Sequence, residues 1–243
     1  MKSLKRKFHY EKLDSTSTFL KCRRFSLRNF TFVSCDYQTD GHGRLGRTWH
    51  SNPKENLLFS LLIKDEKLIK NFSSLSICSA VSILKVLKNY NIDNLSFKWP
   101  NDVYADGKKI CGILLESVSD NGKLSNLIIG IGINVNCKHF NDEYIVPPTS
   151  MCLQLSKDIS IDKLKKQVYR QLKKEFKLLK KRNKEYLKIA REHNFLKDKQ
   201  VYAKINDKLC KIFVKDIADN NALIYEEDGI ENQIFSGEVT FHI

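Results

Sequence analysis

Apolar and polar residues alternate along the chain in patterns that predict a mixture of strands and helices. Residues 30–37 and 57–63 are short runs rich in β-branched, aromatic and aliphatic side chains, which are typical of buried strands. In residues 73–90 the apolar positions recur at helical spacing, which predicts a helix lying on a sheet. Two more apolar runs, 108–116 and 125–136, predict further strands.

The C-terminal third of the chain follows a different pattern. Residues 161–191 are predicted to form one basic helix with an apolar face. From about residue 195 the apolar runs shorten, which predicts a small all-β module with strands at 200–205, 209–214, 222–225 and 237–243. We therefore expect a larger domain of residues 1–194 and a small domain of residues 195–243. The two should pack together, because no flexible linker separates them.

Composition narrows the class of protein. A chain of 243 residues is long enough for one large domain and one small domain. It contains no run of 18 apolar residues and no apolar segment after its basic N-terminus, so we expect neither a membrane span nor a secretory signal. The seven cysteines are odd in number and show no C-x-x-C pairing, which favours free core thiols in a reducing cytoplasm over a zinc site.

The formal charge of +14 is unevenly distributed. Residues 161–191 hold 13 Lys or Arg against 3 Asp or Glu, so this segment carries +10 of the total. Two interpretations remain open: a solvated helix face, or a surface that attracts an acidic partner. A basic nucleic-acid-binding protein is less favoured, because basic and aromatic residues are not interleaved.

The loop at residues 38–49, Gln-Thr-Asp-Gly-His-Gly-Arg-Leu-Gly-Arg-Thr-Trp, combines glycines with arginines. Its glycines allow positive φ and let a ligand approach the backbone closely. Arg44 and Arg47 add fixed positive charge and planar hydrogen-bond donors. A glycine-rich hairpin without a ligand is the alternative, but it leaves the two arginines unexplained. The combination predicts a site for an anionic ligand.

Residues 41–46 formally match the dinucleotide fingerprint G-x-G-x-x-G. That motif requires a helix to begin inside it, whereas residues 48–53 show no helical periodicity, so a nicotinamide enzyme is not favoured. The chain also lacks a G-x-x-x-x-G-K-[ST] loop and any Ser-His-Asp or Cys-His arrangement at suggestive spacing. Positive charge without a nucleophile fits chemistry on phosphates, where orientation and charge stabilisation do most of the work.

Polar residues at the ends of predicted elements add further candidates. Asp14 or Ser15 is a suitable N-cap for a short helix, and in the functional interpretation Ser15 and Thr16 also offer hydroxyls to a ligand at that helix start. Pro100 should end a strand and leave Lys98, Asn101 and Asp102 clustered at its end.

Two polar residues lie within apolar strands. Lys109 enters one of them, where an ammonium is costly unless it meets an anion. Asn134 lies in the other and needs a hydrogen-bond partner. Glycines 130 and 132 in the same strand predict a bulge or the close approach of a ligand.

Four ordered motifs together resemble the biotin–protein ligases. They are residues 41–49, Lys-Trp-Pro-Asn-Asp at 98–102, Lys-Ile-Cys-Gly-Ile-Leu-Leu-Glu at 109–116 and Gly-Ile-Gly-Ile-Asn at 130–134. The similarity covers residues 13–136, and Ser-Gly-Glu-Val at 236–239 resembles the end of that family's C-terminal domain. Because only about twelve residues precede Asp14, the chain is similar to the form without an N-terminal DNA-binding domain.

The resemblance implies an α+β fold, with a mixed-sheet catalytic domain followed by a small SH3-like barrel. It implies a biotin–[acetyl-CoA-carboxylase] ligase that uses ATP and Mg²⁺ to convert biotin into biotinyl-5′-AMP. The biotinyl group then passes to a lysine of a biotin carboxyl carrier protein. The family resemblance leaves a homodimer open and implies no specific DNA binding.

The resemblance also assigns residues. Arg44 and Lys109 are the expected catalytic residues. Biotin is expected to contact Ser15, Thr16, Ser17, Gln38, Gly41, His42, Gly43, Arg44, Lys109 and Gly112. The nucleotide is expected to contact Arg44, Arg47, Trp49, Lys98, Asn101, Asp102, Lys109 and Asn134, and no protein metal site is implied.

Two positions depart from the family pattern, because His42 replaces a frequent arginine and Ser17 replaces a frequent asparagine. The loops at 38–49 and 138–149 are expected to close over the adenylate, with Ile145 and Val146 covering the adenine ring. A lipoate–protein ligase, which shares the catalytic fold, remains an alternative, although its own signature is absent.

Overall fold

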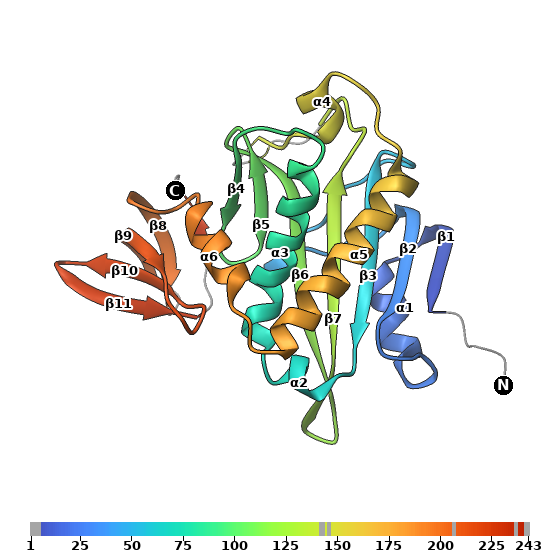
Figure 1. Ribbon diagram of the computed structural model, residues 1–243, viewed down its shortest axis with the longest axis horizontal. Coiled ribbons are helices and arrows are strands. Elements are labelled where there is room, and N and C mark those ends of the chain that lie inside the picture. The colour runs from blue at the N-terminus through green and yellow to red at the C-terminus, as the bar shows by residue number, and fades with distance from the viewer. Residues whose placement is uncertain (1–5, 141–143, 145–146, 206–207, 236–237, 241–243) are drawn as a thin grey trace.

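The computed structural model describes residues 6–140, 144, 147–205, 208–235 and 238–240, and it contains two β-sheets with helices on the larger one (Figure 1). The larger sheet has the strand order β1-β2-β3-β7-β6-β5-β4. Its strands are β1 (Lys7–Leu13), β2 (Thr31–Gln38), β3 (Asn56–Ile63), β4 (Leu95–Lys98), β5 (Asp102–Ala105), β6 (Lys108–Asp120) and β7 (Lys123–Asn134).

The sheet is mixed. Strand β1 runs parallel to β2, and every other neighbouring pair is antiparallel. The predicted strands at 30–37, 57–63, 108–116 and 125–136 are present, whereas β1 was not predicted. It lies at the sheet edge with mostly exposed or half-buried side chains, so it carries only a weak apolar pattern.

The described helices are α1 (Thr16–Arg23), α2 (Glu66–Ile69), α3 (Phe72–Lys88), α4 (Met151–Leu155), α5 (Ile161–Lys180) and α6 (Glu185–Glu192), with short 3₁₀ turns η1 (Arg24–Ser26) and η2 (Arg44–Gly46). Leu61 and Ile129 belong to the large core that includes α3 and α5. Their neighbours Leu62 and Ile128 pack with Leu20 of α1 instead. Since successive side chains of a strand point to opposite faces, α1 lies on one face and α3 with α5 on the other.

The prediction of one helix over residues 161–191 was wrong, because the chain forms α5 and α6 with a break between them. Arg182 adopts a left-handed conformation with φ of 61°, which a helix cannot accommodate. Asn183 then accepts a 2.8 Å hydrogen bond from the amide of Glu185 at the start of α6. The apolar periodicity survived this turn, so the sequence pattern alone did not show the break.

The C-terminal module is an antiparallel five-stranded sheet of order β11-β10-β9-β8-β12. Its strands are β8 (Lys199–Ile205), β9 (Lys208–Ile217), β10 (Leu223–Glu227), β11 (Ile230–Ile234) and β12 (Glu238–Thr240). Strand β11 was not predicted, because its residues are largely exposed and polar. Among the residues that the structure describes, no pairing of β11 with β12 closes the sheet into a barrel.

Asn221 connects this module to the larger sheet. Its backbone oxygen accepts a 3.0 Å hydrogen bond from Trp99 Nε1. Its side chain accepts from the Tyr186 hydroxyl at 2.8 Å and donates to Ser74 Oγ at 3.1 Å. One residue of the module thus contacts the end of β4, helix α3 and helix α6, all in a buried environment.

Most of the cysteines are core residues, as predicted. Burial raises the pKa of the Cys35 and Cys137 thiols to about 12, which disfavours the reactive thiolate. In the described part of the chain, no helix has both the length and the apolar character needed to cross a membrane.

Candidate functional site

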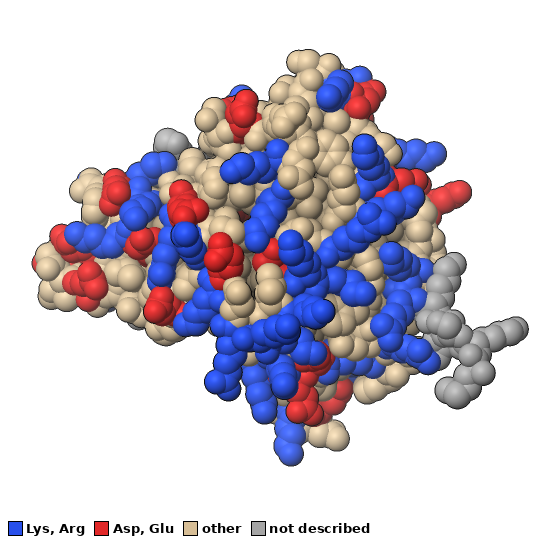
Figure 2. Space-filling model, in the orientation of Figure 1, with Lys and Arg blue, Asp and Glu red and all other residues tan. Residues whose placement is uncertain are grey.

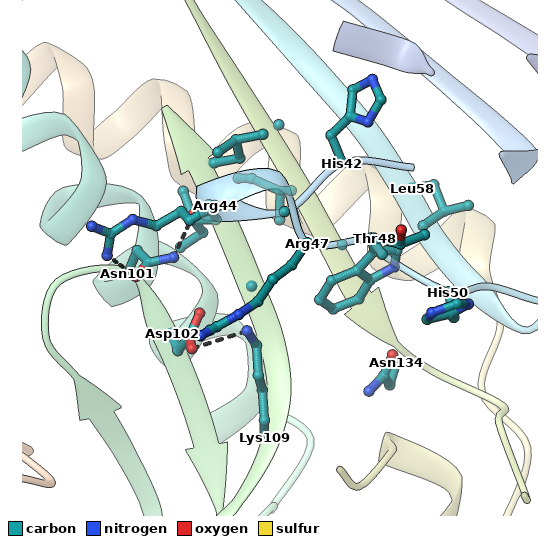
Figure 3. A pocket seen from close by; sticks show the side chains of 18 of the residues that line it. His42, Arg44, Arg47, Thr48, His50, Leu58, Asn101, Asp102, Lys109 and Asn134 are labelled. Atoms are coloured by element: carbon teal, nitrogen blue, oxygen red, sulfur yellow. Dashed lines mark hydrogen bonds and ion pairs between the residues drawn. The ribbon is translucent and has the colours of Figure 1, made fainter. Parts of the chain in front are cut away.

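A pocket of about 400 Å³ lies on the α1 face of the larger sheet (Figure 3). Its floor is formed by β3, β6 and β7, and its walls by the start of α1, the 38–50 loop and the segment 98–102. Ser60 and Gly130 lie on this floor, two positions from Leu62 and Ile128, so they share the face that carries α1. The cavity lies in the size range of small-molecule sites.

The 38–49 loop folds back on itself over the pocket. The Gly43 amide donates to Arg47 O at 2.6 Å, and the Trp49 amide donates to Gly41 O at 2.8 Å. The loop contains only the single turn η2, so no α-helix begins inside the glycine motif and a dinucleotide fingerprint is not formed.

Positive φ does not account for all three glycines of residues 41–46. Of the three, only Gly46 has a positive φ, of 74°. At Gly41, a Cβ atom would lie 2.5 Å from Trp49 O, and at Gly43 it would lie 3.2 Å from Arg47 O. The loop's own backbone therefore excludes a side chain at Gly41 and leaves little room for one at Gly43.

One end of the pocket is cationic. Arg44, Arg47, Lys98 and Lys109 line it, and Asp102 is the single carboxylate among the described lining residues. Lys109 Nζ lies 2.9 Å from Asp102 Oδ2, and Arg47 extends toward the same pair from the opposite wall (Figure 3). With four cations against one anion, this end is suited to further negative charge.

The positive charges also lower one another's pKa. Burial lowers the pKa of the Lys98 ammonium, Asp102 raises it, and Lys109 and Arg47 lower it further. Burial likewise lowers the pKa of the Arg44 guanidinium, against the effect of Asp102. The protein thus holds cations together in an unfavourable arrangement that an anionic ligand would relieve.

Asn101 fixes the geometry between these charges. Its Oδ1 accepts a 3.1 Å hydrogen bond from Arg44 Nη1, and its Nδ2 donates to Ile113 O at 2.7 Å. Asp102 Oδ1 is buried and has no hydrogen-bond partner in the described part of the chain. Lys109, which was expected to meet an anion, therefore meets Asp102, and one oxygen of that carboxylate is left available.

Trp49 lies flat on a glycine pair in the middle of the floor. Gly112 of β6 and Gly132 of β7 face one another across the strands. A Cβ atom at Gly132 would lie 2.5 Å from Trp49 Cε2, and one at Gly112 would lie 2.8 Å from Cζ3. These glycines therefore mark the close approach of Trp49. The bulge that was considered for residues 130–132 is not present there, since the one register shift between β6 and β7 lies at Val118/Ser119.

The other end of the pocket is neutral and rich in hydroxyl groups. The Thr16 amide and hydroxyl both donate to Gln38 Oε1, at 2.8 and 2.9 Å. Ser60 Oγ lies 2.8 Å from Thr16 Oγ1 and 2.9 Å from Ser17 Oγ. Ser15 caps α1 by accepting from the amides of Ser17 and Thr18. Such a chain of donors and acceptors suits a neutral polar ligand group.

Asn134 has the partners that its position required. Its Oδ1 accepts from Asn56 Nδ2 at 3.0 Å, and its Nδ2 donates to Thr149 O at the same distance. Asn134 also lines the pocket (Figure 3). These bonds hold the end of β7 against the segment that follows residue 147.

The structure brings nearly all of the predicted site residues together. Those lining this one pocket are Ser15, Thr16, Ser17, Gln38, His42, Gly43, Arg44, Arg47, Trp49, Lys98, Asn101, Asp102, Lys109, Gly112 and Asn134. Gly41 lies behind them, against Trp49. His42 points its Nε2 toward Asp40 Oδ2, 3.6 Å away. The roles assigned to these residues stay predictions.

Other lining residues were missed. Ser60 is the one polar residue of the apolar run 57–63, and that isolation was a usable signal. Val239 ends the closing motif at 236–239 and Tyr144 lies in the 138–149 segment, and neither had been named as a residue of the pocket. Ile145 and Val146, expected to cover an adenine ring, lie outside the described residues, as do Ser236 and Gly237 of the closing motif.

Comparison with known proteins points to one family. Residues 10–134 match the model of the biotin/lipoate A/B protein ligase family. The chain is 29% identical over 232 residues to the bifunctional ligase/repressor BirA of Escherichia coli, an overlap of 94% of this chain and 71% of that protein. It is 36% identical over 106 residues to BirA of Bacillus subtilis, and this match spans 44% of the chain but only 33% of that relative.

Solved structures agree in fold. Biotin protein ligase from Aquifex aeolicus, in complex with biotin and ATP, matches with a TM-score of 0.86 at 26% identity, and the match covers 98% of each chain. The predicted α+β class, with a mixed sheet followed by a small antiparallel β module, is thereby confirmed.

Proposed function

Because the chain belongs to the biotin/lipoate A/B protein ligase family, we propose that it activates biotin with ATP and transfers the biotinyl group to a protein lysine. The observation that carries this proposal is the pocket itself. Its hydroxyl-rich end around Thr16 and Ser60 suits a neutral cyclic urea, and its cationic end around Lys109 suits a carboxylate beside phosphates.

In the first half-reaction a carboxylate oxygen of biotin attacks the α-phosphorus of ATP. The bond from that phosphorus to the bridging oxygen breaks, and pyrophosphate leaves while biotinyl-5′-AMP remains. Two anions must approach for this to happen, and Lys109, Arg44 and Arg47 offset their repulsion from fixed positions. Asn101 holds Arg44 in place, which lowers the reorganisation needed at the moment of reaction.

In the second half-reaction a lysine amine of a biotin carboxyl carrier protein attacks the acyl carbon of the adenylate. The bond between that carbon and the phosphate oxygen breaks, AMP leaves, and the amine loses its proton. The 38–49 loop forms a wall of the pocket, where it would limit the access of water to this reactive anhydride.

Mg²⁺ fits the pocket as a companion of ATP. In the described residues no cluster of three His, Cys, Asp or Glu forms a protein-only metal site. Asp102 Oδ1 is a buried carboxylate oxygen without a partner, and Mg²⁺ is commonly held by one or two carboxylates together with substrate phosphates. Bound in this way, the ion would neutralise phosphate charge.

We further propose that residues 1–194 form the catalytic domain and residues 195–243 a supporting domain. The enzyme is proposed to be cytoplasmic and not to bind operator DNA specifically. The supporting observation for the second domain is that Val239 reaches the pocket wall.

Biotin-dependent exchange of labelled pyrophosphate into ATP tests the proposed activity. We expect exchange with biotin and none with lipoate. Exchange with lipoate alone would assign the chain to the other branch of its family. Transfer is then tested with a purified carrier domain and with the same domain whose acceptor lysine is replaced by arginine.

A further inference from the structure

Helix α5 carries a continuous row of exposed basic side chains that the proposed ligase function does not use. We call this row the basic stripe, and it consists of Lys163, Lys166, Arg170, Lys173 and Lys177 of α5 together with Lys181 at its C-cap. Spacings of three or four residues place all six on one side of the helix, opposite its buried apolar residues. At 1.5 Å per residue the stripe is roughly 27 Å long.

Neighbouring acidic residues do not neutralise the stripe. Asp162 pairs with Lys165 at 2.7 Å, and Glu175 is buried and pairs with Lys85 at 2.7 Å. In the described part of the chain, no ion pair with a carboxylate involves a member of the stripe. Like charges at this spacing destabilise a helix, so the stripe is an arrangement that folding alone does not favour.

The stripe lies on the face opposite the pocket. Helices α3 and α5 cover one face of the larger sheet, and the pocket lies on the other face with α1. Figure 2 shows this helix-covered face, where Lys and Arg gather over α5 and toward the end near α2. A partner bound there would not block biotin, ATP or an acceptor lysine.

Apolar anchors are missing from helix α5 itself, and Phe72 at the start of α3 is an exposed apolar side chain on the same face of the sheet. Among the described residues, none of the exposed large hydrophobic side chains belongs to α5 or α6. Tyr169 of α5 is buried, with Lys7 and Lys173 near its ring, so it offers no free face for stacking a base. A protein partner would bind through apolar side chains at the centre of the interface, and a single-stranded nucleic acid would stack its bases on aromatic side chains. The phosphate backbone of a duplex needs only a row of positive charges.

We propose that the basic stripe binds the phosphate backbone of a nucleic-acid duplex without regard to sequence. Each cation that meets a phosphate releases a counterion, and this release supplies the binding free energy. The stripe stands on a helix whose other face packs into the core, so its backbone needs no ordering on binding and only the exposed side chains do. The proposal is independent of the ligase function.

Fluorescence anisotropy with two labelled duplexes of about 30 base pairs and unrelated sequence tests this proposal. For six phosphate contacts, we expect log K to fall with log salt concentration with a slope of about −5. Affinity should then drop by about 10³ between 50 and 200 mM salt, equally for both duplexes.

A matched pair of variants locates the surface. The first carries Lys166→Gln, Arg170→Gln, Lys173→Gln and Lys177→Gln, and it should make the slope shallower by about 3 to 4. The control carries Lys12→Gln, Lys123→Gln, Lys157→Gln and Lys208→Gln, which remove the same charge from exposed positions outside α5. The control should keep a slope close to that of the wild type. If the first variant melts early through loss of the Lys173–Tyr169 contact, Lys163→Gln replaces Lys173→Gln in it.

Three results would overturn the proposal. The first is no binding at about 50 mM salt, where a six-contact surface binds measurably. The second is an equal loss of slope in both variants, which would trace binding to net charge alone. The third is tighter binding to vesicles with anionic headgroups, or competition by poly-glutamate as effective as by duplex, which would assign the stripe to a lipid surface or an acidic protein.

Discussion

Lys109 and Asp102 illustrate how a single residue pair prepares the site for an anion. The 2.9 Å ion pair places the Lys109 ammonium at the cationic end of the pocket, with its side chain 32% exposed. The lysine is thus held for a ligand rather than buried in the core. Since Asp102 uses only part of the hydrogen-bond donor capacity of the Lys109 ammonium, this group can also donate to a carboxylate or phosphate of a ligand.

Replacement of Lys109 by alanine should slow adenylate formation. One fixed donor is lost from the developing negative charge, which typically lowers a rate by about 10² to 10³. Biotin-dependent pyrophosphate exchange measures this loss, and Lys123→Ala, at an exposed hairpin lysine, is the control. Normal exchange in a folded Lys109→Ala protein would show that the residue has no part in the chemistry.

Lys98→Met should raise thermal stability while lowering activity. Burial lowers the pKa of Lys98, so the unfolded chain binds this proton more tightly than the folded chain does. The Lys98 ammonium therefore destabilises the folded state. This destabilisation is fully present at neutral pH and disappears as pH rises toward the ordinary lysine pKa of 10.5. Adenylation should fall on the order of 10², because a charge-stabilising donor is lost.

Melting curves of wild type and Lys98→Met at several pH values check this prediction. The variant should melt higher at pH 7, and the difference should shrink on going to alkaline pH. A variant that melts lower at neutral pH would mean that Lys98 stabilises the fold through its contacts, including the one with the Tyr104 ring.

At the scale of elements, strands β6 and β7 support the 38–49 loop through the contact of Trp49 with Gly112 and Gly132. The cross-strand glycines 112 and 132 leave a bare patch of backbone, and the Trp49 ring fills it. The indole Nε1 is buried there without a hydrogen-bond partner in the described residues. The loop position therefore depends on the absence of two side chains in a distant hairpin.

Gly132→Ala should displace Trp49 and loosen the loop. A Cβ atom 2.5 Å from the ring forces a shift, and overpacking of this kind typically costs about 1 to 3 kcal/mol. We expect weaker ATP binding by calorimetry and a lower melting temperature. A double-mutant cycle with Trp49→Ala provides the control, because the alanine at 132 should cost little once the ring is gone. Additive effects would contradict this account.

At the scale of the whole molecule, the C-terminal module is tied to the pocket through Asn221. The Trp99 indole that donates to Asn221 O lies between Lys98 and Pro100, in the segment that forms one pocket wall. Val239 of the same module completes the lining. Docking of the module thus helps to set the position of pocket residues.

Asn221→Gly should weaken this coupling without straining the backbone, since φ at this position is 73° and glycine tolerates it. The Tyr186 hydroxyl and Ser74 lose buried partners, which should lower the free energy of unfolding by about 1 to 3 kcal/mol. We also expect the KM for ATP to rise more than the KM for biotin.

Denaturant titration and steady-state kinetics measure the two effects. Asn220→Gly, at the exposed neighbouring residue, is the matched control. A destabilised Asn221→Gly protein with an unchanged KM for ATP would show that the module supports the fold but not the site.

The sequence by itself determined the elements with strong local patterns. Side-chain periodicity identified β2, β3, α3, β6 and β7, because burial on one or both faces imposes it directly. The sequence also singled out residues that nearly all line one pocket, most of them within the four motifs, whereas Ser15, Thr16, Ser17 and Gln38 lie outside these motifs, and the roles of all of them stay predictions.

Only the tertiary structure decided which of these residues meet. Lys109 pairs with Asp102, Ser60 joins Thr16 and Ser17, and Trp49 rests on Gly132, although each pair is separated in sequence. Such partners are set by the order and register of the strands, which depend on the whole sheet. Edge strands β1 and β11 escaped prediction because their exposed segments carry no strong burial pattern. The break before α6 escaped it because the apolar periodicity continues across the turn at Arg182.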